Sequence, residues 1–209
     1  PVPNIIASPE VEVARRFKRD TADHVMTVLH EEGLYRHLRF AAPQPDSWMH
    51  WFEIVTWPGH LAITGDMDSF SVKASADTFM HSRISDMFEF FRGNGINPTY
   101  WSQKVDGGAG VKAFSRDEFR SEVLDYIKDS VADWPGLREA VADEVFGDES
   151  IGCSRSAHAA LYQFEHEGFR FDDASELDFE RFTPQYLWCC HAIVWGIAQY
   201  DAARKAVAA

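Results

Sequence analysis

The sequence has few of the features that define several large classes of protein. It has 3 cysteines among 209 residues, and two of them, Cys189 and Cys190, are adjacent. This spacing fits neither a zinc site nor a redox motif, and an odd number of cysteines suits a reducing compartment. The apolar segment Tyr186 to Tyr200 is too short to cross a membrane. The first twenty residues lack a basic segment followed by an apolar run, so no secretory signal is predicted. A soluble protein of the cytoplasm is expected.

Basic charge is also scarce. The chain has 20 Lys and Arg against 33 Asp and Glu, and its net charge is −13. This charge excludes non-specific binding to nucleic acids and docking on anionic lipid, because both need clusters of Lys and Arg. The acidity is concentrated in the second half of the chain. Asp117 to Glu149 holds 11 acids and 3 bases, and Glu165 to Glu180 holds 7 acids and 1 base.

Recognisable motifs for cofactors and for nucleophilic catalysis are missing as well. The glycine-rich segment Gly107 to Gly110 lacks the Lys-Ser/Thr pair of a phosphate-binding loop. Cys190 and His191 are neighbours on a predicted helix and point about 100° apart, so they cannot form a nucleophile–base pair. His158 and His166 are eight residues apart, about 12 Å along a helix, which is too far for one metal ion to bind both. The sequence therefore predicts no cofactor and no metal.

Apolar residues are abundant, at 45% of the chain, and the segment Trp48 to Met67 is the densest in large ones. It predicts two strands joined at Trp57 to His60. Met49 to Trp57 alternates with apolar residues on both faces, which is typical of a central strand that is covered on both sides. Short connections link it to strands at Leu34 to Phe40, Leu61 to Thr64 and Ser69 to Lys73. These segments predict an antiparallel sheet of about four strands.

Helices are expected on either side of this sheet. Pro9 to Glu32 is predicted as the first helix, with Ser8 as N-cap and Gly33 as its end, and Ala76 to Arg92 as the second. After a glycine-rich, irregular segment from Asn94 to Gly110, the chain is nearly all helical. The last helix, Tyr186 to Tyr200, is predicted at the centre of a C-terminal bundle. The fold class is α+β, in a single domain over residues 1–209 with a sheet-containing half over about 1–93 and a helical half over about 111–209. The later helices are predicted to begin at Ser115, Pro135, Ser154 and Thr183.

Several short motifs occur together along residues 37 to 200. Trp51 to Gly59 and Thr64 to Met67 are distinctive, and the weaker motifs lie at His37–Phe40, Asp86–Phe91, Tyr100–Ser102 and Trp188–Cys190. Together they resemble a family of small proteins encoded by bacteriophages and prophages. The family pattern has a glycine where this chain has Asp68. The family has no established activity, so the resemblance implies no catalytic residues. It implies a phage context, in which proteins without an enzymatic signature often modulate host machinery, including by inhibition of defence complexes in the manner of anti-CRISPR proteins.

The first functional hypothesis is a non-enzymatic interaction protein. It would bind and inhibit a host nucleic-acid-handling or defence complex, with an acidic helical surface or exposed aromatic side chains in contact with its partner. A scaffold with this much negative charge can compete for a basic groove that normally holds DNA or RNA, and the alternative is that the charge serves solubility. The residues predicted to contact the partner, chosen by charge density alone, are Asp129, Asp133, Glu139, Asp143, Glu144, Asp148 and Glu149.

The second hypothesis is a small hydrolase that acts on a nucleotide or a modified base. Its site would consist of Glu53, Asp66, His50 and His60, near the turns of the sheet. This requires the four side chains to converge in a pocket and the pKa of Glu53 to lie above its ordinary value. A structural component of a virion is a third possibility, which the presence of the protein in purified particles would reveal.

Overall fold

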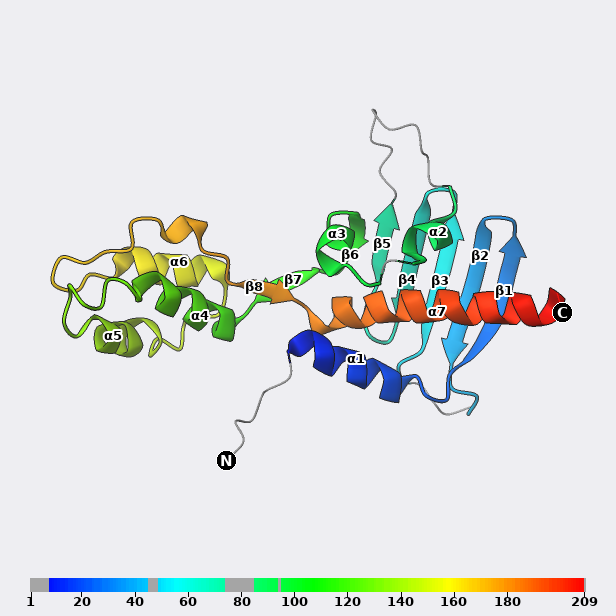
Figure 1. Ribbon diagram of the computed structural model, residues 1–209, viewed down its shortest axis with the longest axis horizontal. Helices are drawn as coiled ribbons and strands as arrows, with labels where there is room; N and C mark the ends of the chain where they lie inside the picture. The colour runs from blue at the N-terminus through cyan, green and yellow to red at the C-terminus, as the bar shows by residue number, and fades with distance from the viewer. Residues whose placement is uncertain (1–7, 45–48, 74–84, 94, 209) are drawn as a thin grey trace. The chain divides into compact units, whose positions relative to one another are not determined.

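The computed structural model describes residues 8–44, 49–73, 85–93 and 95–208 (Figure 1). The chain forms two compact units. The sheet unit consists of Pro1–Val111 and Thr183–Ala209, and the acidic unit consists of Lys112–Phe182. The α+β class expected from the sequence is confirmed. The division into halves is different, because the last helix belongs to the sheet unit and the acidic unit is inserted before it.

Six antiparallel strands form the sheet, and strands that are neighbours in the sheet are also neighbours in the sequence. The predicted number of about four was wrong, because a strand was missed at each edge. The four inner strands are those that the alternating sequence pattern indicated. The six are β1 Val25–Glu32, β2 Tyr35–Ala41, β3 Phe52–Trp57, β4 His60–Gly65, β5 Phe70–Lys73 and β6 Val105–Gly108.

The first edge strand, β1, replaces the second half of the predicted first helix. Helix α1 spans only Pro9–Asp20, and the Thr21 hydroxyl donates a hydrogen bond to the Phe17 carbonyl at 2.8 Å, just beyond the helix end. In the predicted helix Val25 and Val28 would lie on its apolar, buried side, but in the structure they are 51% and 44% exposed. The β-branched residues of this segment favour a strand. Pairing with β2 outweighs the helical spacing of the apolar residues.

The other edge strand, β6, lies in the glycine-rich segment that was predicted to be irregular. Gly108 has a φ of +115°, and a Cβ atom there would lie 2.1 Å from the Ser69 carbonyl oxygen. Glycine is therefore what allows this strand to approach β5 so closely. Gly108 belongs to the glycine-rich segment that predicted a loop from the sequence, but it is in fact required for the close pairing of β6 with β5.

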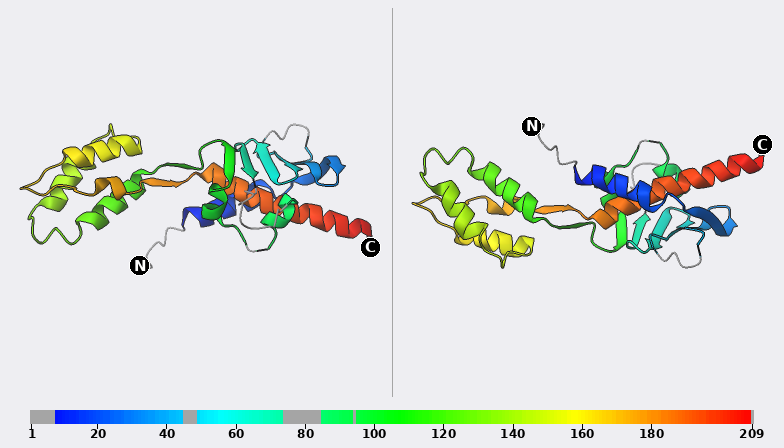
Figure 2. Two further views of the ribbon diagram at one scale, coloured as in Figure 1. Left: turned by 90° about the horizontal axis from the view of Figure 1, so that it is seen from above. Right: turned by 90° about the horizontal axis from the view of Figure 1, so that it is seen from below.

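Helices α1, α2 (Met87–Phe91) and α7 (Pro184–Ala208) lie on one face of the sheet, which we call the inner face (Figures 1 and 2). In β3, Phe52, Ile54 and Thr56 face inward and are buried, whereas Glu53 and Val55 face outward and are partly exposed. The prediction that this strand is covered on both faces was therefore wrong for the part of the chain that the structure describes. The outer face is the more accessible of the two.

The last helix, α7 (Pro184–Ala208), packs on the inner face and not in a bundle. The Thr183 side chain accepts a hydrogen bond from the Tyr186 amide at 3.2 Å, so the predicted start of this helix is confirmed. At Gly196 a Cβ atom would lie 2.8 Å from Ile54 Cδ1, and this close approach explains why a glycine occupies the middle of the helix. Among the described helices, none is both long and apolar enough to cross a membrane.

A partly buried ion pair joins β2 to the short helix α2 (Met87–Phe91). The Arg36 guanidinium donates two hydrogen bonds to the Asp86 carboxylate, at 2.9 and 3.0 Å. Asp86 also accepts from the Phe88 amide and so caps α2. The Arg36 guanidinium carbon lies 4.5 Å from the centroid of the Phe88 ring. Of the helix predicted over Ala76 to Arg92, residues 76–84 lie outside the described residues.

The acidic unit has a core of its own, centred on Phe119, Leu161 and Phe179. The Ser115 hydroxyl accepts a hydrogen bond from the Glu118 amide at 3.3 Å and caps the first helix, as predicted. The helix predicted at Pro135 begins at Leu137 and continues into a π-helical turn. The elements are β7 Lys112–Phe114, α4 Arg116–Ile127, α5 Leu137–Ala140, η1 Val141–Val145, α6 Ser154–Gln163, η2 Ala174–Glu176 and β8 Glu180–Phe182.

Candidate functional site

The four residues of the predicted hydrolase site lie in three different places. Asp66 and His50 meet at one end of the β3–β4 hairpin, where an Asp66 carboxylate oxygen accepts a hydrogen bond from the His50 amide at 2.9 Å. His60 begins β4 at the opposite end, about 20 Å away along the strand. Glu53 faces outward, whereas the His50 ring lies 6.4 Å from the buried Trp188 ring. The structure does not bring the four side chains together.

Glu53 belongs to a polar network on the outer face. Its carboxylate lies 2.7 Å from both His37 Nε2 and Arg39 Nη1, on the neighbouring strand. Burial raises the pKa of Glu53, but hydrogen bonds and charge interactions with His37 and Arg39 outweigh this effect. The pKa therefore lies below the ordinary value of a glutamate. This is opposite to the shift that a general acid at this position would need.

We expect an NMR titration of the Glu53 carboxyl carbon, assigned with Glu53→Gln, to give a pKa below the ordinary range. A pKa lower in the folded than in the unfolded state adds stability above the unfolded value of about 4.3, and this stability is lost as the pH falls through the folded value. Wild type should therefore exceed Glu53→Gln in free energy of unfolding by on the order of 1 kcal/mol at neutral pH, and by less below about pH 4. A Glu53 pKa near 6 would contradict this and support the hydrolase hypothesis.

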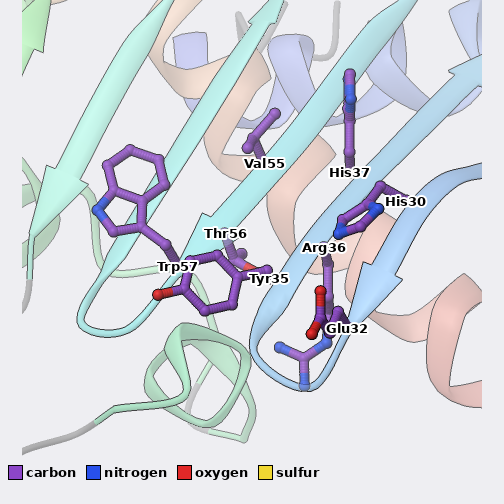
Figure 3. A pocket seen from close by; sticks show the side chains of 8 residues that line it. All are labelled: His30, Glu32, Tyr35, Arg36, His37, Val55, Thr56 and Trp57. Atoms are coloured by element: carbon purple, nitrogen blue, oxygen red, sulfur yellow. The ribbon is translucent and has the colours of Figure 1, made fainter.

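A shallow depression of about 610 Å³ lies on the sheet where β1 and β3 end and β2 begins (Figure 3). Tyr35 and Trp57 come from neighbouring strands and lie beside it, and Tyr35 is 54% exposed. The Trp57 ring stacks on His60 with ring centroids 5.1 Å apart. The first functional hypothesis named exposed aromatic side chains as a possible contact but did not single out these two. Both residues lie at strand ends next to hairpin turns, and this position in the sequence could have indicated that they lie side by side.

The seven acidic residues chosen from the sequence all lie in the acidic unit, between the end of α4 and the loop before α6. Six are exposed, and Asp148 is partly buried. Hydrogen bonds from Ser150 lower the pKa of Asp148. Within the described chain none of the seven forms an ion pair. The ion pairs of this unit use other acids, in the pairs Lys112–Asp178, Lys128–Asp125, Arg170–Glu165 and Arg181–Glu118.

The two histidines of the possible metal site, His158 and His166, make structural contacts, and the adjacent cysteines Cys189 and Cys190 are buried. His158 Nδ1 lies 2.8 Å from the Ser154 carbonyl oxygen, and His166 Nε2 lies 2.9 Å from that of Pro135. Over the described ranges no three His, Cys, Asp or Glu side chains are placed to hold a metal ion. Burial raises the pKa of the Cys190 thiol to about 12. A thiol with such a pKa is inert at neutral pH.

The motif Thr64 to Met67 closes the open end of the β3–β4 hairpin. A Cβ atom at Gly65 would lie 2.2 Å from the Trp51 carbonyl oxygen, so only glycine fits there. The next amide, that of Asp66, donates to the same oxygen at 3.0 Å. Two residues on, the Asp68 carboxylate accepts a hydrogen bond from the Ser69 amide at 2.8 Å. The most distinctive motif of the sequence therefore has a structural role.

Comparison with known proteins gives no assignment. No protein-family model, no curated protein and no solved structure matches the chain. The functional argument therefore rests on the charges and the geometry of the two units.

Proposed function

We propose that the chain is a non-enzymatic binding protein of phage origin that inhibits a host nucleic-acid-handling or defence complex in the cytoplasm. The acidic unit makes the contact, and it binds a basic groove that otherwise holds DNA or RNA. The segregation of charge between the two units carries this proposal. The acidic unit contains 18 acidic and 8 basic residues, net −10, whereas the rest of the chain contains 15 and 12, net −3.

The state of the seven selected acids also differs from that of several carboxylates in the sheet unit. In the sheet unit, Asp86, Glu53 and Asp201 each form an ion pair with an arginine at 2.7 to 2.9 Å. The seven selected acids of the acidic unit have no such partner among the described residues. An exposed carboxylate without an internal partner contributes fully to the surface potential. It can also bind a cation of another protein without first breaking an ion pair of its own.

The acidic unit also provides a defined scaffold for these charges. Its core rings, for example Phe119 and Phe179 with centroids 4.9 Å apart, fix the backbone of the unit. Three of the seven acids lie in α5 and η1, and the other four lie in turns and loops. Asp143 and Glu144 lie in the π-helical turn η1, between the buried Val141 and Val145. Backbone segments that are ordered before binding lose less conformational entropy on association. The unit therefore presents its carboxylates from fixed backbone positions.

Neutralising four of the acids tests the proposal. A variant with Asp129→Asn, Asp133→Asn, Asp143→Asn and Glu144→Gln is expected to bind its partner on the order of 10- to 100-fold more weakly at low salt. The assay is recovery of a nucleic-acid-binding complex from host lysate with the tagged chain at low and high salt. Displacement of DNA or RNA from the recovered complex is then measured.

A matched variant removes the same number of charges from the second acidic segment, with Glu165→Gln, Asp172→Asn, Asp173→Asn and Glu176→Gln. It is expected to lose much less affinity. Binding that does not change with salt would contradict the proposal. Loss of binding in a Tyr35→Ser, Trp57→Ser variant, with the four-acid variant unaffected, would instead assign the contact to the aromatic depression of the outer face.

A further inference from the structure

The edge strand β1 carries an unusual surface. Over the described residues it pairs with β2 alone, so its other edge has free backbone donors and acceptors. Proteins commonly protect such an edge with lysine, proline, a bulge or a very short strand. β1 is eight residues long and contains neither lysine nor proline. A bulge interrupts its register with β2 between Val28 and His30, so Val25–Val28 pair regularly with β2 and Leu29 is the extra residue of the bulge. We call Val25–Leu29 the pairing segment.

This pairing segment is uncharged and apolar. Val25, Val28 and Leu29 are 51%, 44% and 48% exposed. Val28 faces inward, because it pairs with Leu38, which is fully buried, yet Val28 itself remains uncovered. In a chain with a net charge of −13, five consecutive exposed or half-exposed residues without charge stand out as a contact surface.

The segment is also complementary to itself. If two copies pair antiparallel with Thr27 opposite Thr27, then Met26 lies opposite Val28 and Val25 lies opposite Leu29. Directly opposite residues share a face of the sheet, so every exposed apolar side chain of the segment gains an apolar neighbour. Cross-strand threonine pairs are favourable. The charged residues Glu31 and Glu32 lie outside the five paired residues.

Helix α7 supplies an independent indication, because it continues past the sheet at β1 (Figure 1). Tyr200 hydrogen-bonds Glu31 of β1, and the helix ends eight residues later at Ala208, about 12 Å further on. With strands about 4.8 Å apart, this length corresponds to two more strands. Residues 202–207 are exposed, and Val207 is 87% exposed. A sheet continued by a second copy places strands next to this projecting end.

We infer that Val25–Leu29 is a dimerisation surface, at which β1 of two copies joins their sheets into one of twelve strands. A two-fold axis at Thr27 relates the copies and keeps both inner faces on the same side. The contact consists of one short strand pair and the ends of two helices. Interfaces of this small size give dissociation constants of about micromolar magnitude.

Sedimentation velocity of the full chain, over a concentration series that brackets the micromolar range, is expected to show a monomer–dimer equilibrium. Thr27→Lys places two like charges opposite each other at the axis, at a side chain that is exposed in the single copy. It is expected to weaken dimerisation about tenfold or more. His30→Lys is the matched control, because it adds a lysine to the same strand outside the pairing segment. It is expected to dimerise like wild type.

Cross-linking makes the test independent of the stability of the lysine variant. In a Cys153→Ser background, which removes the exposed native thiol, Thr27→Cys is expected to form covalent dimers with a short thiol-reactive cross-linker. His30→Cys is expected not to, because the two copies of residue 30 lie about 20 Å apart along the strands in this register. A wild type that stays monomeric over the whole series would overturn the inference. So would a dimer that Thr27→Lys leaves intact, or equal cross-linking of the two cysteine variants.

Discussion

Replacing Asp86 by alanine is expected to lower the free energy of unfolding of the sheet unit by about 3 to 5 kcal/mol. The reason is that the Arg36 side chain, which is 9% exposed, loses both of its hydrogen bonds to the carboxylate and remains as a buried charge. Helix α2 also loses its N-cap, which is worth about 1 kcal/mol. Urea denaturation followed by tryptophan fluorescence measures the effect.

Two further variants separate the contributions to this loss. Asp86→Asn keeps an oxygen that can cap α2 but removes the charge, so it isolates the ion pair. The double variant Arg36→Met, Asp86→Leu removes both charges and is expected to recover most of the stability, since a buried ion pair gains little over apolar residues of similar size. A loss below about 1 kcal/mol in Asp86→Ala would show that water reaches Arg36 and compensates its charge.

The same pair predicts how the stability of the sheet unit depends on pH. Burial raises the pKa of Asp86, but the hydrogen bonds from Arg36 and Phe88 and the neighbouring positive charge outweigh burial and leave it below the ordinary value. The contribution of Asp86 is therefore present above its unfolded pKa of about 3.9 and is lost as the pH falls through the folded pKa.

Phe119→Ala is expected to destabilise the acidic unit by about 3 to 5 kcal/mol and to leave the sheet unit nearly unchanged. Phe119 is 1% exposed, and its ring meets Phe179 and Phe146 edge-on. Its core cluster lies entirely within residues 112–182. Hydrogen exchange read by mass spectrometry assigns the loss of protection to peptides of one unit or the other.

Phe52→Ala is the matched variant in the sheet unit. Phe52 is also 1% exposed, and it packs on Phe40 and Trp188. Its loss is expected to appear in peptides of the sheet unit and not in those of residues 112–182. If both variants lowered the protection of both units equally, the chain would unfold as one cooperative domain, as the sequence alone suggested.

Local patterns in the sequence were sufficient for the middle of the sheet. The alternation through Phe52 to Trp57 and the turn at Pro58-Gly59 located β3 and β4, because period-two burial and turn residues are local signals. The edge strands were missed for two different reasons. In β1 a helical spacing of apolar residues continued by coincidence from α1, and in β6 glycine was needed for close pairing. The position of α7 could not be predicted from the sequence. A buried apolar helix can pack on a sheet or in a helical bundle, and only its tertiary contacts distinguish the two.

The exposure of the acidic residues could be predicted from solvation alone, whereas their contact with a partner stays a prediction. Charged residues seldom lose water without a partner, so the exposure of Asp129, Asp133 and Glu139 followed from their type. The separation of the four residues of the hydrolase hypothesis could not be predicted, because it depends on the face and the end of the hairpin at which each residue lies. One contact of Glu53 could have been predicted from the sequence. Arg39 and Glu53 lie on two neighbouring predicted strands, and the structure places them directly opposite each other.

The acidic unit leaves and re-enters the sheet unit at two adjacent points. The Thr183 amide donates a hydrogen bond to the Val111 carbonyl at 2.9 Å, so the ends of the inserted segment are already joined across a single backbone contact. A short turn between these two residues could replace all 71 residues between them without stretching the chain. The acidic unit is thus an inserted domain, whose removal or replacement as a whole would leave the two ends of the sheet unit in place.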